Sequence, residues 1–247
     1  MQRYFVNDFK DNHFYISNDD RHHIVKVMRL KVDDQIICVG KGKSAICRIE
    51  EITDEKVCAE VVKWEEGSVE LPVQIAIASG LPKGDKLEWI IQKGTELGAS
   101  TFIPFAASRS VVKWDDKKAG KKVERWNKIA KEAAEQSHRQ VLPEVNHPAT
   151  LKSLIDLSKN YDYKLIAFEE DAKQGESSVL HTALRSIQQG QSILFVFGPE
   201  GGLTEEEVSL LKENGFQSCG LGPRILRTET APLYVLAAVS YQTELMR

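Results

Sequence analysis

Two glycine-bearing segments in the C-terminal third of the chain have residue types that could bind a ligand through the main chain. The first, residues 197–202, follows a continuous apolar run short enough to be a buried strand. Thr204 and Glu207 come next, with the S/T-x-x-E spacing of a capping box, and predict the start of a helix. Gly201 and Gly202 allow positive φ in the turn between this strand and the helix. A ligand can therefore approach bare N–H and C=O groups there. A tight strand-to-helix connection without a ligand is the alternative interpretation.

The second segment, residues 221–231, adds apolar side chains to a similar loop. Leu221, Ile225 and Leu226 could form the walls around a flat ring, while main-chain groups read the polar edge of an adenine. Ligands of open α/β sheets bind outside the carboxyl ends of the strands, so we expect both segments to line one pocket. The residues predicted to contact this ligand are Phe197, Gly198, Pro199, Glu200, Gly201, Gly202, Leu221, Gly222, Ile225, Leu226, Thr230 and Ala231.

Several common catalytic motifs are absent from the sequence. It contains no P-loop, dinucleotide-binding, nucleophile-elbow or H-E-x-x-H motif. His22 and His23 are adjacent, so on a helix they point to different faces and are poorly placed to share a metal. The four cysteines show no C-x-x-C spacing, and each lies within an apolar run. We therefore predict no metal site, and cysteines that act as small buried hydrophobic residues.

Downstream of residue 72 the hydrophobic pattern alternates between short strands and longer helices. The predicted strands are 73–78, 101–105, 164–168, 193–197 and 218–221, and the predicted helices are 85–97, 120–138, 178–187, 204–214 and 230–245. Such alternation is typical of a doubly wound parallel α/β sheet. The fold would place each glycine-bearing segment directly after a strand, where ligands bind.

The first 70 residues have a strand-rich pattern instead. Period-2 alternation predicts short strands at 3–6, 13–16, 35–40, 44–52 and 57–63, with one helix at 19–29. This helix should bury Ile24, Val27 and Met28, which are spaced by three and four residues. Many short strands with one helix suggest a small closed barrel, and the polar residues 64–70 are the expected linker. We therefore expect two domains, 1–70 and 71–247.

The composition is that of an ordinary soluble protein, with a net charge of only -3 that is unevenly distributed. Residues 81–140 carry 13 lysines and arginines against 8 acidic residues, a local excess that could neutralise phosphates. For any single lysine a solvated surface is the better explanation. No membrane-length apolar run or signal peptide is found, so we expect a cytoplasmic protein. The predicted RNA contacts are Arg3, Arg29, Arg109, Lys113, Lys117, Lys118, Lys121 and Lys122.

The last predicted helix, 230–245, is apolar almost all round, with Pro232 tolerated in its first turn. A helix without a polar face must be buried on every side. It could lie at the centre of a large core. Burial against a second subunit is at least as plausible at the end of a medium-sized domain, so we expect a homodimer.

The two glycine-bearing segments resemble a known family signature. Gly-Pro-Glu-Gly-Gly at 198–202 and Leu-Gly-x-Arg-Ile-Leu-Arg-x-Glu-Thr-Ala at 221–231 are similar to the signature of the SPOUT methyltransferases. More narrowly, they resemble the RsmE-type enzymes, which methylate N3 of a uridine in small-subunit ribosomal RNA. One departure is Asp33, at a turn position where glycine is expected, so this turn could be altered. Weaker matches follow in order along the chain at 2–6, 22–30, 92–98, 108–112 and 132–137.

The resemblance implies a fold, a cofactor and a partner. It implies a C-terminal SPOUT-type parallel α/β domain with a deep trefoil knot, preceded by a small PUA-like, OB-type β-barrel that binds RNA. The implied cofactor is S-adenosyl-L-methionine, held bent by the two glycine-bearing segments. The implied partner is 16S ribosomal RNA, within the small subunit or a late assembly particle.

Methyl transfer from a sulfonium needs the nucleophile aligned with the methyl group and, for this substrate, removal of the uridine N3 proton. Glu229 could act as the base or orient one, and Arg227 could stabilise the developing anion or grip a phosphate. An Arg–Glu pair that only braces the loop is the alternative for both residues. Two other functions stay open: a SPOUT enzyme that acts on transfer RNA, and a non-catalytic, dimeric RNA-binding protein whose α/β half is a dimerisation platform.

Overall fold

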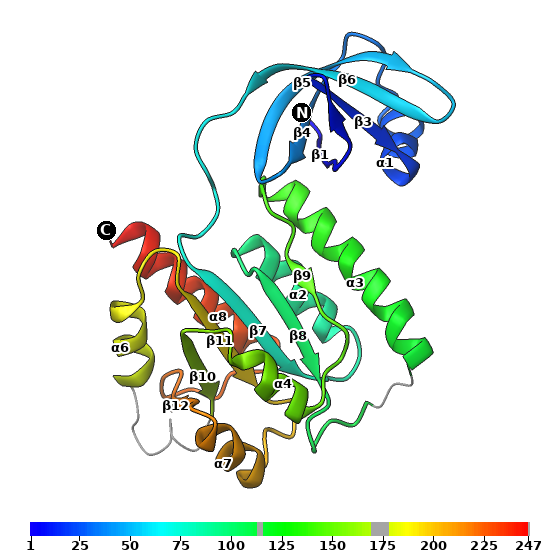
Figure 1. Cartoon of the computed structure of the whole chain (residues 1–247). Coiled ribbons are helices and arrows are strands. Elements are labelled where there is room, and N and C mark those ends of the chain that lie inside the picture. The colour runs from blue at the N-terminus through cyan, green and yellow to red at the C-terminus, as the bar shows by residue number, and fades with distance from the viewer. Residues whose placement is uncertain (113–115, 169–177, 247) are drawn as a thin grey trace. The chain divides into compact units, whose positions relative to one another are not determined.

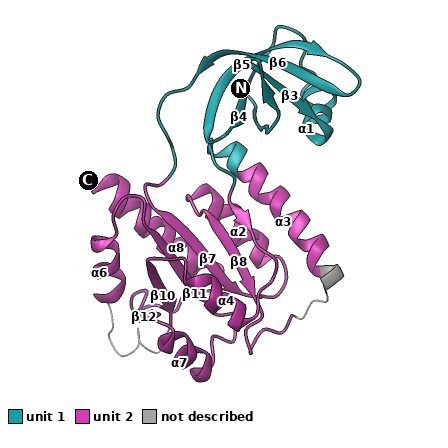
Figure 2. Ribbon diagram, in the orientation of Figure 1, with its two compact units in different colours: residues 1–70, 134–142 teal, residues 71–133, 143–247 magenta. Residues whose placement is uncertain are grey.

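The computed structural model describes residues 1–112, 116–168 and 178–246, with the main chain alone for 116–118 (Figure 1). The chain forms two compact units (Figure 2). Unit 1 comprises Met1–Glu70 and Ala134–Leu142, and unit 2 comprises Leu71–Ala133 and Pro143–Arg247. Among the described residues, no helix is both long and apolar enough to span a membrane.

Unit 1 is built on a curled six-stranded sheet in the order β1-β4-β5-β6-β3-β2. Its pairs are antiparallel except β1 with β4. One core fills it, in which Tyr4, Phe14 and Ile36 are almost completely buried. The predicted strands are confirmed, whereas β2 was missed because two residues show no periodicity. The strands are β1 (Arg3–Phe5), β2 (Phe9–Lys10), β3 (His13–Ser17), β4 (Gln35–Gly40), β5 (Lys43–Ile52) and β6 (Lys56–Trp64).

The predicted helix of unit 1 is confirmed, but its buried face differs from the prediction. It consists of α1 (Asn18–His22) and a π-helical turn, η1 (His23–Val27). Ile24 is buried as expected, whereas Val27 is 57% exposed. The wider π turn closes with a hydrogen bond from the Met28 N–H to the His23 carbonyl oxygen (2.9 Å), which rotates the residues around it away from α-helical positions.

The turn at Asp33 keeps the conformation that a glycine would favour. Asp33 has φ of 74°, and its N–H donates to the Ile49 carbonyl oxygen at 2.8 Å. The carboxylate is exposed and lies 3.6 Å from the Arg48 guanidinium. Aspartate is one of the few residues that tolerate the left-handed region, so the departure from glycine leaves the turn intact.

Unit 1 includes a segment, Ala134–Leu142, that sequence analysis assigned to the second domain. The Glu70 carboxylate accepts hydrogen bonds from the Arg139 guanidinium (3.1 and 2.6 Å) and from the N–H groups of Gln140 and Val141 (2.8 and 3.1 Å). Nearly all of the Arg139 side chain is buried, at 5% exposure. A buried charge-assisted network of this kind joins segments far apart in sequence, for which no local pattern exists.

Unit 2 contains a six-stranded, all-parallel sheet in the order β12-β10-β11-β7-β8-β9. The predicted parallel α/β fold is thereby confirmed. The trefoil knot stays a prediction. The strands are β7 (Gln74–Gly80), β8 (Thr101–Phe105), β9 (Glu144–Val145), β10 (Tyr163–Ala167), β11 (Ser192–Phe197) and β12 (Gln217–Cys219).

Helices cover both faces of this sheet (Figure 1). Alternate residues of β11 enter two separate cores: Phe195 packs with residues of α2, α3, α6 and α8, whereas Leu194 packs with residues of α4 and α7. The eight-residue α4 was not predicted. The helices are α2 (Lys86–Glu96), α3 (Asp116–Gln136), α4 (Leu151–Ser158), α6 (Ser178–Ser186), α7 (Glu205–Glu213) and α8 (Thr230–Ser240), with α8 continuing as a π turn, η2 (Tyr241–Leu245).

Candidate functional site

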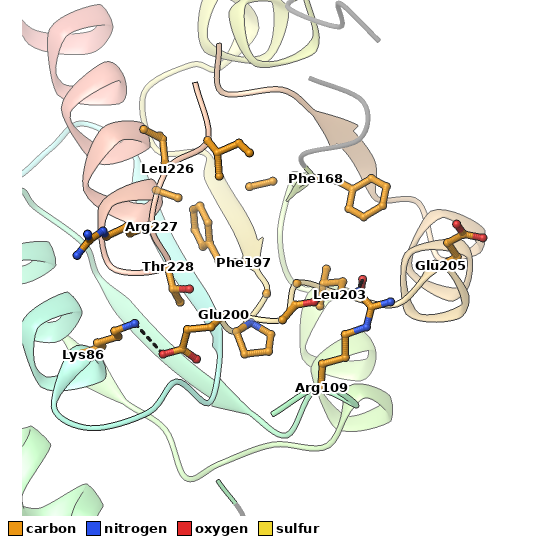
Figure 3. Close-up of a pocket in the computed structure, with 17 residues that line it drawn as sticks. Lys86, Arg109, Phe168, Phe197, Glu200, Leu203, Glu205, Leu226, Arg227 and Thr228 are labelled. Atoms are coloured by element: carbon orange, nitrogen blue, oxygen red, sulfur yellow. Dashed lines mark hydrogen bonds and ion pairs between the residues drawn. The ribbon is translucent and has the colours of Figure 1, made fainter. Parts of the chain in front are cut away.

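Both glycine-bearing segments line one pocket of about 560 Å³ in unit 2, at the carboxyl ends of β10 and β11 (Figure 3). Leu221, Gly222 and Thr230, which were predicted to contact a ligand, are not among its lining residues. The predicted residues that do line it are Phe197, Gly198, Pro199, Glu200, Gly201, Gly202, Ile225, Leu226, Arg227 and Ala231. Sequence reasoning missed Lys86, Ala167, Phe168, Leu203, Glu205 and Thr228, and assigned Arg109 to RNA.

The first glycine-bearing segment is a turn in which the main chain folds back on itself. The Gly202 N–H donates to the Pro199 carbonyl oxygen at 2.8 Å, and Gly202 has φ of 71°. Gly201 does not have positive φ, so the expectation was right for Gly202 and wrong for Gly201. A Cβ atom at Gly198 would lie 2.8 Å from the Gly202 carbonyl carbon and from the Leu203 nitrogen. Only glycine allows this close approach.

The turn leads into α7 through the predicted capping box. The Thr204 N–H donates to the Glu207 carboxylate at 2.9 Å, and the Glu207 N–H donates to Oγ1 of Thr204 at 3.2 Å. The other oxygen of Glu207 accepts a hydrogen bond from the Ser108 N–H at 2.7 Å. This carboxylate therefore fixes both the helix start and the loop that follows β8.

Arg109, on that same loop, reaches the glycine turn. Its Nη1 donates to the carbonyl oxygens of Gly201 (2.9 Å) and Leu203 (3.4 Å). The guanidinium thereby satisfies two main-chain acceptors of the turn and adds a positive charge to the pocket wall. This placement favours a role for Arg109 in the pocket over the predicted RNA contact.

Lys86 connects the two glycine-bearing segments. Its Nζ lies 2.8 Å from Oε1 of Glu200 and 3.7 Å from Oε2 of Glu229, which follow β11 and precede α8 respectively. Burial opposes ionisation of Glu200, but hydrogen bonds from Lys86 and from main-chain N–H groups outweigh it and lower the pKa of Glu200. The hydrogen bond to Glu200 raises the pKa of Lys86.

Arg227 and Glu229 do not form the brace that was the alternative interpretation. Among the described residues, the cation within 4.0 Å of the Glu229 carboxylate is Lys86. Arg227 has an exposed side chain and lines the pocket, and its carbonyl oxygen accepts hydrogen bonds from the N–H groups of Thr230 (2.8 Å) and Ala231 (3.0 Å). The main chain of Arg227 thus starts α8, while its guanidinium stays available to a ligand.

The other residues predicted to contact RNA are spread over both units. Arg3 is only 6% exposed, and its Nη2 lies 3.4 Å from the Glu65 carboxylate. Arg29 is exposed, as is Lys121, whereas Lys122 lies 3.4 Å from Glu88. Lys113 lies outside the described residues, as do the side chains of Lys117 and Lys118. Arg3 is therefore unsuited to the predicted role, because its guanidinium is inaccessible.

Three side chains with metal-ligand chemistry gather on unit 1, although no metal was predicted. His13, Glu50 and Cys58 have ligand atoms within 4.8 Å of one another. Hydrogen bonds from the ring to the Asp11 carbonyl oxygen and to Glu50 raise the pKa of His13. The hydrogen bond between the His13 ring and Glu50, at 2.9 Å, accounts for their close approach without a metal ion. All four cysteines are buried, as predicted.

A parallel α/β sheet with two glycine-bearing loops around one pocket is an architecture suited to binding a nucleoside-containing cofactor. The family model described as the RNA methyltransferase domain matches residues 69–240, and the RNA methyltransferase PUA domain matches residues 16–62. The fold and site thus define an RNA methyltransferase with an N-terminal PUA domain.

Similarity to individual proteins narrows this class. The chain is 55% identical to ribosomal RNA small subunit methyltransferase E of Bacillus subtilis, over 100% of this chain and 99% of the relative. It is 33% identical to the enzyme of that name from Mesomycoplasma hyopneumoniae, over 96% and 97%. The solved structure of the Neisseria gonorrhoeae enzyme of that name, bound to S-adenosyl methionine, superposes with a TM-score of 0.83 at 30% identity, over 98% and 97%. The chain belongs to the ribosomal RNA small subunit methyltransferase E family, the RsmE family predicted above.

Substitutions in the glycine turn should affect cofactor binding in a defined order. Gly198→Ala should weaken S-adenosylmethionine binding at least about tenfold, because its Cβ would clash with main-chain atoms that cannot move alone. Gly201→Ala should be milder, since its Cβ would meet the Arg109 side chain at 3.1 Å. Titration calorimetry measures both.

Gly120→Ala is the matched control. Gly120 lies in α3 with open space around its Cβ position, so this change should leave cofactor affinity unaltered and stabilise the helix by up to about 1 kcal/mol. Equal affinities for the Gly198 and Gly120 variants would contradict the view that the turn forms the cofactor site.

Proposed function

We propose that this protein transfers the methyl group of S-adenosyl-L-methionine to N3 of a uridine in 16S ribosomal RNA. The observation that carries the proposal is the pocket built from two glycine-bearing loops of unit 2. Membership of the RsmE family and similarity to a structure with bound S-adenosyl methionine support it. The substrate would be met in the cytoplasm, within the small subunit or a late assembly particle.

The pocket suits the proposed cofactor in shape and in the chemistry of its walls. The side chains of Phe197, Ile225 and Leu226 supply apolar surface for a purine ring. Glycines at 198 and 202 line the pocket and place no side chain between the main chain and the purine, so main-chain groups of the turn can approach its polar edge. The trefoil knot would hold these loops in place. When bound, the cofactor supplies an electrophilic methyl group.

The residues around the pocket would perform the acid–base work. The uridine N3–H bond must break as the nitrogen lone pair forms a bond to the methyl carbon, and the carbon–sulfur bond electrons return to sulfur. Glu229 is our candidate acceptor of that proton: it does not itself line the pocket, but its carboxylate lies 3.7 Å from the pocket residue Lys86, and its buried Oε2 makes no hydrogen bond within the described structure. The exposed guanidinium of Arg227 would stabilise the negative charge on the uracil ring.

Glu229→Gln and Arg227→Ala test this assignment. We expect turnover to fall by about 10²–10⁴-fold for the lost base and about 10²–10³-fold for the lost cation. The affinity for S-adenosylmethionine should change only a few-fold, because neither side chain forms the glycine turn. The assay is transfer of labelled methyl groups to small-subunit RNA, with mass mapping of the modified nucleoside.

Arg224→Ala is the control for Arg227→Ala. Arg224 is an exposed arginine of the same loop that does not line the pocket, so its loss should leave turnover unchanged. Methylation of transfer RNA but not of 16S RNA would favour the transfer-RNA alternative. An absence of cofactor binding and of any methyl transfer would favour the non-catalytic RNA-binding protein.

We also propose that 16S RNA is bound through exposed cations. Arg29 of unit 1 and Lys121 of unit 2 are exposed, whereas the Lys122 ammonium is shared with Glu88. The lysines at 113, 117 and 118 remain part of this proposal on the basis of the sequence alone.

Lys121→Ala should lower RNA affinity and reduce the slope of log K against log salt by roughly 0.7 to 0.9, the amount expected for one lost phosphate contact. Lys122→Ala should have a smaller effect, because Glu88 already compensates its charge. Fluorescence anisotropy at several salt concentrations measures both slopes. Identical salt dependence in wild type and Lys121→Ala would make this lysine a solvated surface residue.

We further propose that the protein is a homodimer formed through α8 and η2. Val235, Leu236 and Val239 are buried within their own unit, while Tyr234 (42%), Tyr241 (56%) and Leu245 (73%) are exposed. The helix therefore has one apolar side covered by its own chain and another side of aromatic and aliphatic residues left open. A second copy would cover that side.

Tyr241→Glu should convert the dimer to a 27.8 kDa monomer without unfolding it, since this side chain is exposed within its own unit. Val235→Glu should instead unfold unit 2, because Val235 is completely buried there. Light scattering at micromolar concentration gives the mass, and circular dichroism reports folding. A wild-type protein that scatters as a monomer would contradict the proposed dimer.

A further inference from the structure

Lys86 is the only described lysine that lines the pocket, and it comes from neither glycine-bearing segment. It lies in the first turn of α2, and Figure 3 shows its ammonium directed at Glu200. The Nζ atom is 2.8 Å from Glu200 and 3.7 Å from Glu229. A third element of unit 2 thus joins the two loops through one cation.

The two carboxylates depend on Lys86 to different extents. Glu200 also accepts a hydrogen bond from the Lys83 N–H at 3.1 Å, so it keeps an anchor to the start of α2 if the ammonium is removed. Glu229 has no such second anchor within the described structure: its Oε2 is buried and makes no hydrogen bond. The side chain of Glu229 is only 20% exposed, which limits the solvation of its carboxylate by water.

The 3.7 Å contact between Lys86 and Glu229 is an ion pair without a hydrogen bond. Such a contact attracts the carboxylate through its charge, and it leaves the lone pairs of Oε2 free of a hydrogen bond from the ammonium. A direct hydrogen bond from the ammonium would occupy the oxygen that a base must offer to its proton donor. This geometry suits a cation that holds a catalytic base in place without occupying the oxygen that accepts the proton.

We propose that Lys86 is a positioning residue for methyl transfer, whose ammonium holds the Glu229 carboxylate in place to accept the substrate proton. The inference rests on the proposed role of Glu229. Without Lys86, the attraction that holds the Glu229 carboxylate would be lost, and Glu229 would be left near the carboxylate of Glu200 with no cation between them. Repulsion between the two carboxylates would then displace Glu229 from its place.

Lys86→Met tests this proposal, because methionine retains most of the chain length and removes the charge. We expect kcat to fall at least tenfold while KM for RNA changes less than about threefold. In the Glu229→Gln background the same change should cost no further rate, because Lys86 acts through Glu229. Lys86→Arg should restore most of the rate.

Lys93→Met is the matched control. Lys93 lies on the same helix and pairs with Glu96 at 2.7 Å, so its loss removes an ion pair of α2 that does not line the pocket. This variant should keep wild-type kcat. Thermal unfolding and S-adenosylmethionine affinity, measured for every variant, report any loss of structure.

The outcomes separate the inference from the function on which it rests. If the wild type does not methylate 16S RNA, or if Glu229→Gln stays fully active, the proposed function or its base has failed. If Glu229→Gln is inactive but Lys86→Met retains its rate, Lys86 does not act through Glu229. A lower rate of Lys86→Met without rescue by arginine, or a further loss of rate when the change is added to Glu229→Gln, would equally overturn the inference. Should Lys86→Met fail to fold, Lys86→Arg still tests it, since a large loss of kcat in that variant contradicts a role based on charge.

Discussion

The close approach of main chain to main chain at the glycine turn is the constraint on which the site depends. Gly198 lies against the peptide between Gly202 and Leu203, with no room for a single added carbon. A second glycine extends the contact: a Cβ at Gly80, the last residue of β7, would lie 2.6 Å from the Pro199 ring. Strand β7 therefore ends in a glycine and the adjacent parallel strand β11 is followed by one, which lets the turn rest directly on the sheet.

The turn satisfies the Pro199 carbonyl oxygen itself, whereas the carbonyl oxygens of Gly201 and Leu203 take their hydrogen bonds from outside it. The surrounding chain supplies the missing donors. Arg109 satisfies two carbonyl groups, and Glu207 joins the start of α7 to the loop that carries Arg109. Lys86 likewise donates a hydrogen bond to the Glu200 carboxylate at the tip of the turn. The side chains that support the turn also set the charge of the pocket, so stability and electrostatics are supplied together.

The sequence was most informative where a physical signal is local. The capping box at Thr204 and the buried strand before the turn follow from residues within a few positions of one another, and both are confirmed. The buried face of the first helix was wrong at Val27, since a π turn cannot be read from α-helical spacing. Lys86 and Arg109 act across about a hundred residues of chain, and a lysine near a helix start gives no sign of a distant carboxylate. The burial of Arg3 could not be predicted for the same reason, because it depends on residues that are distant in the sequence.

The non-contiguous composition of unit 1 has a consequence for synthesis on the ribosome. Residues 1–70 leave the exit tunnel first, but the donors that satisfy the Glu70 carboxylate belong to Arg139 and its neighbours, 69 residues later. At roughly 5 to 20 residues per second, the N-terminal sheet waits about 3 to 14 s for its last segment. By then the chain has also passed through β7, α2, β8 and α3 of the other unit. The PUA unit of this protein is therefore completed only after the construction of the methyltransferase unit has begun.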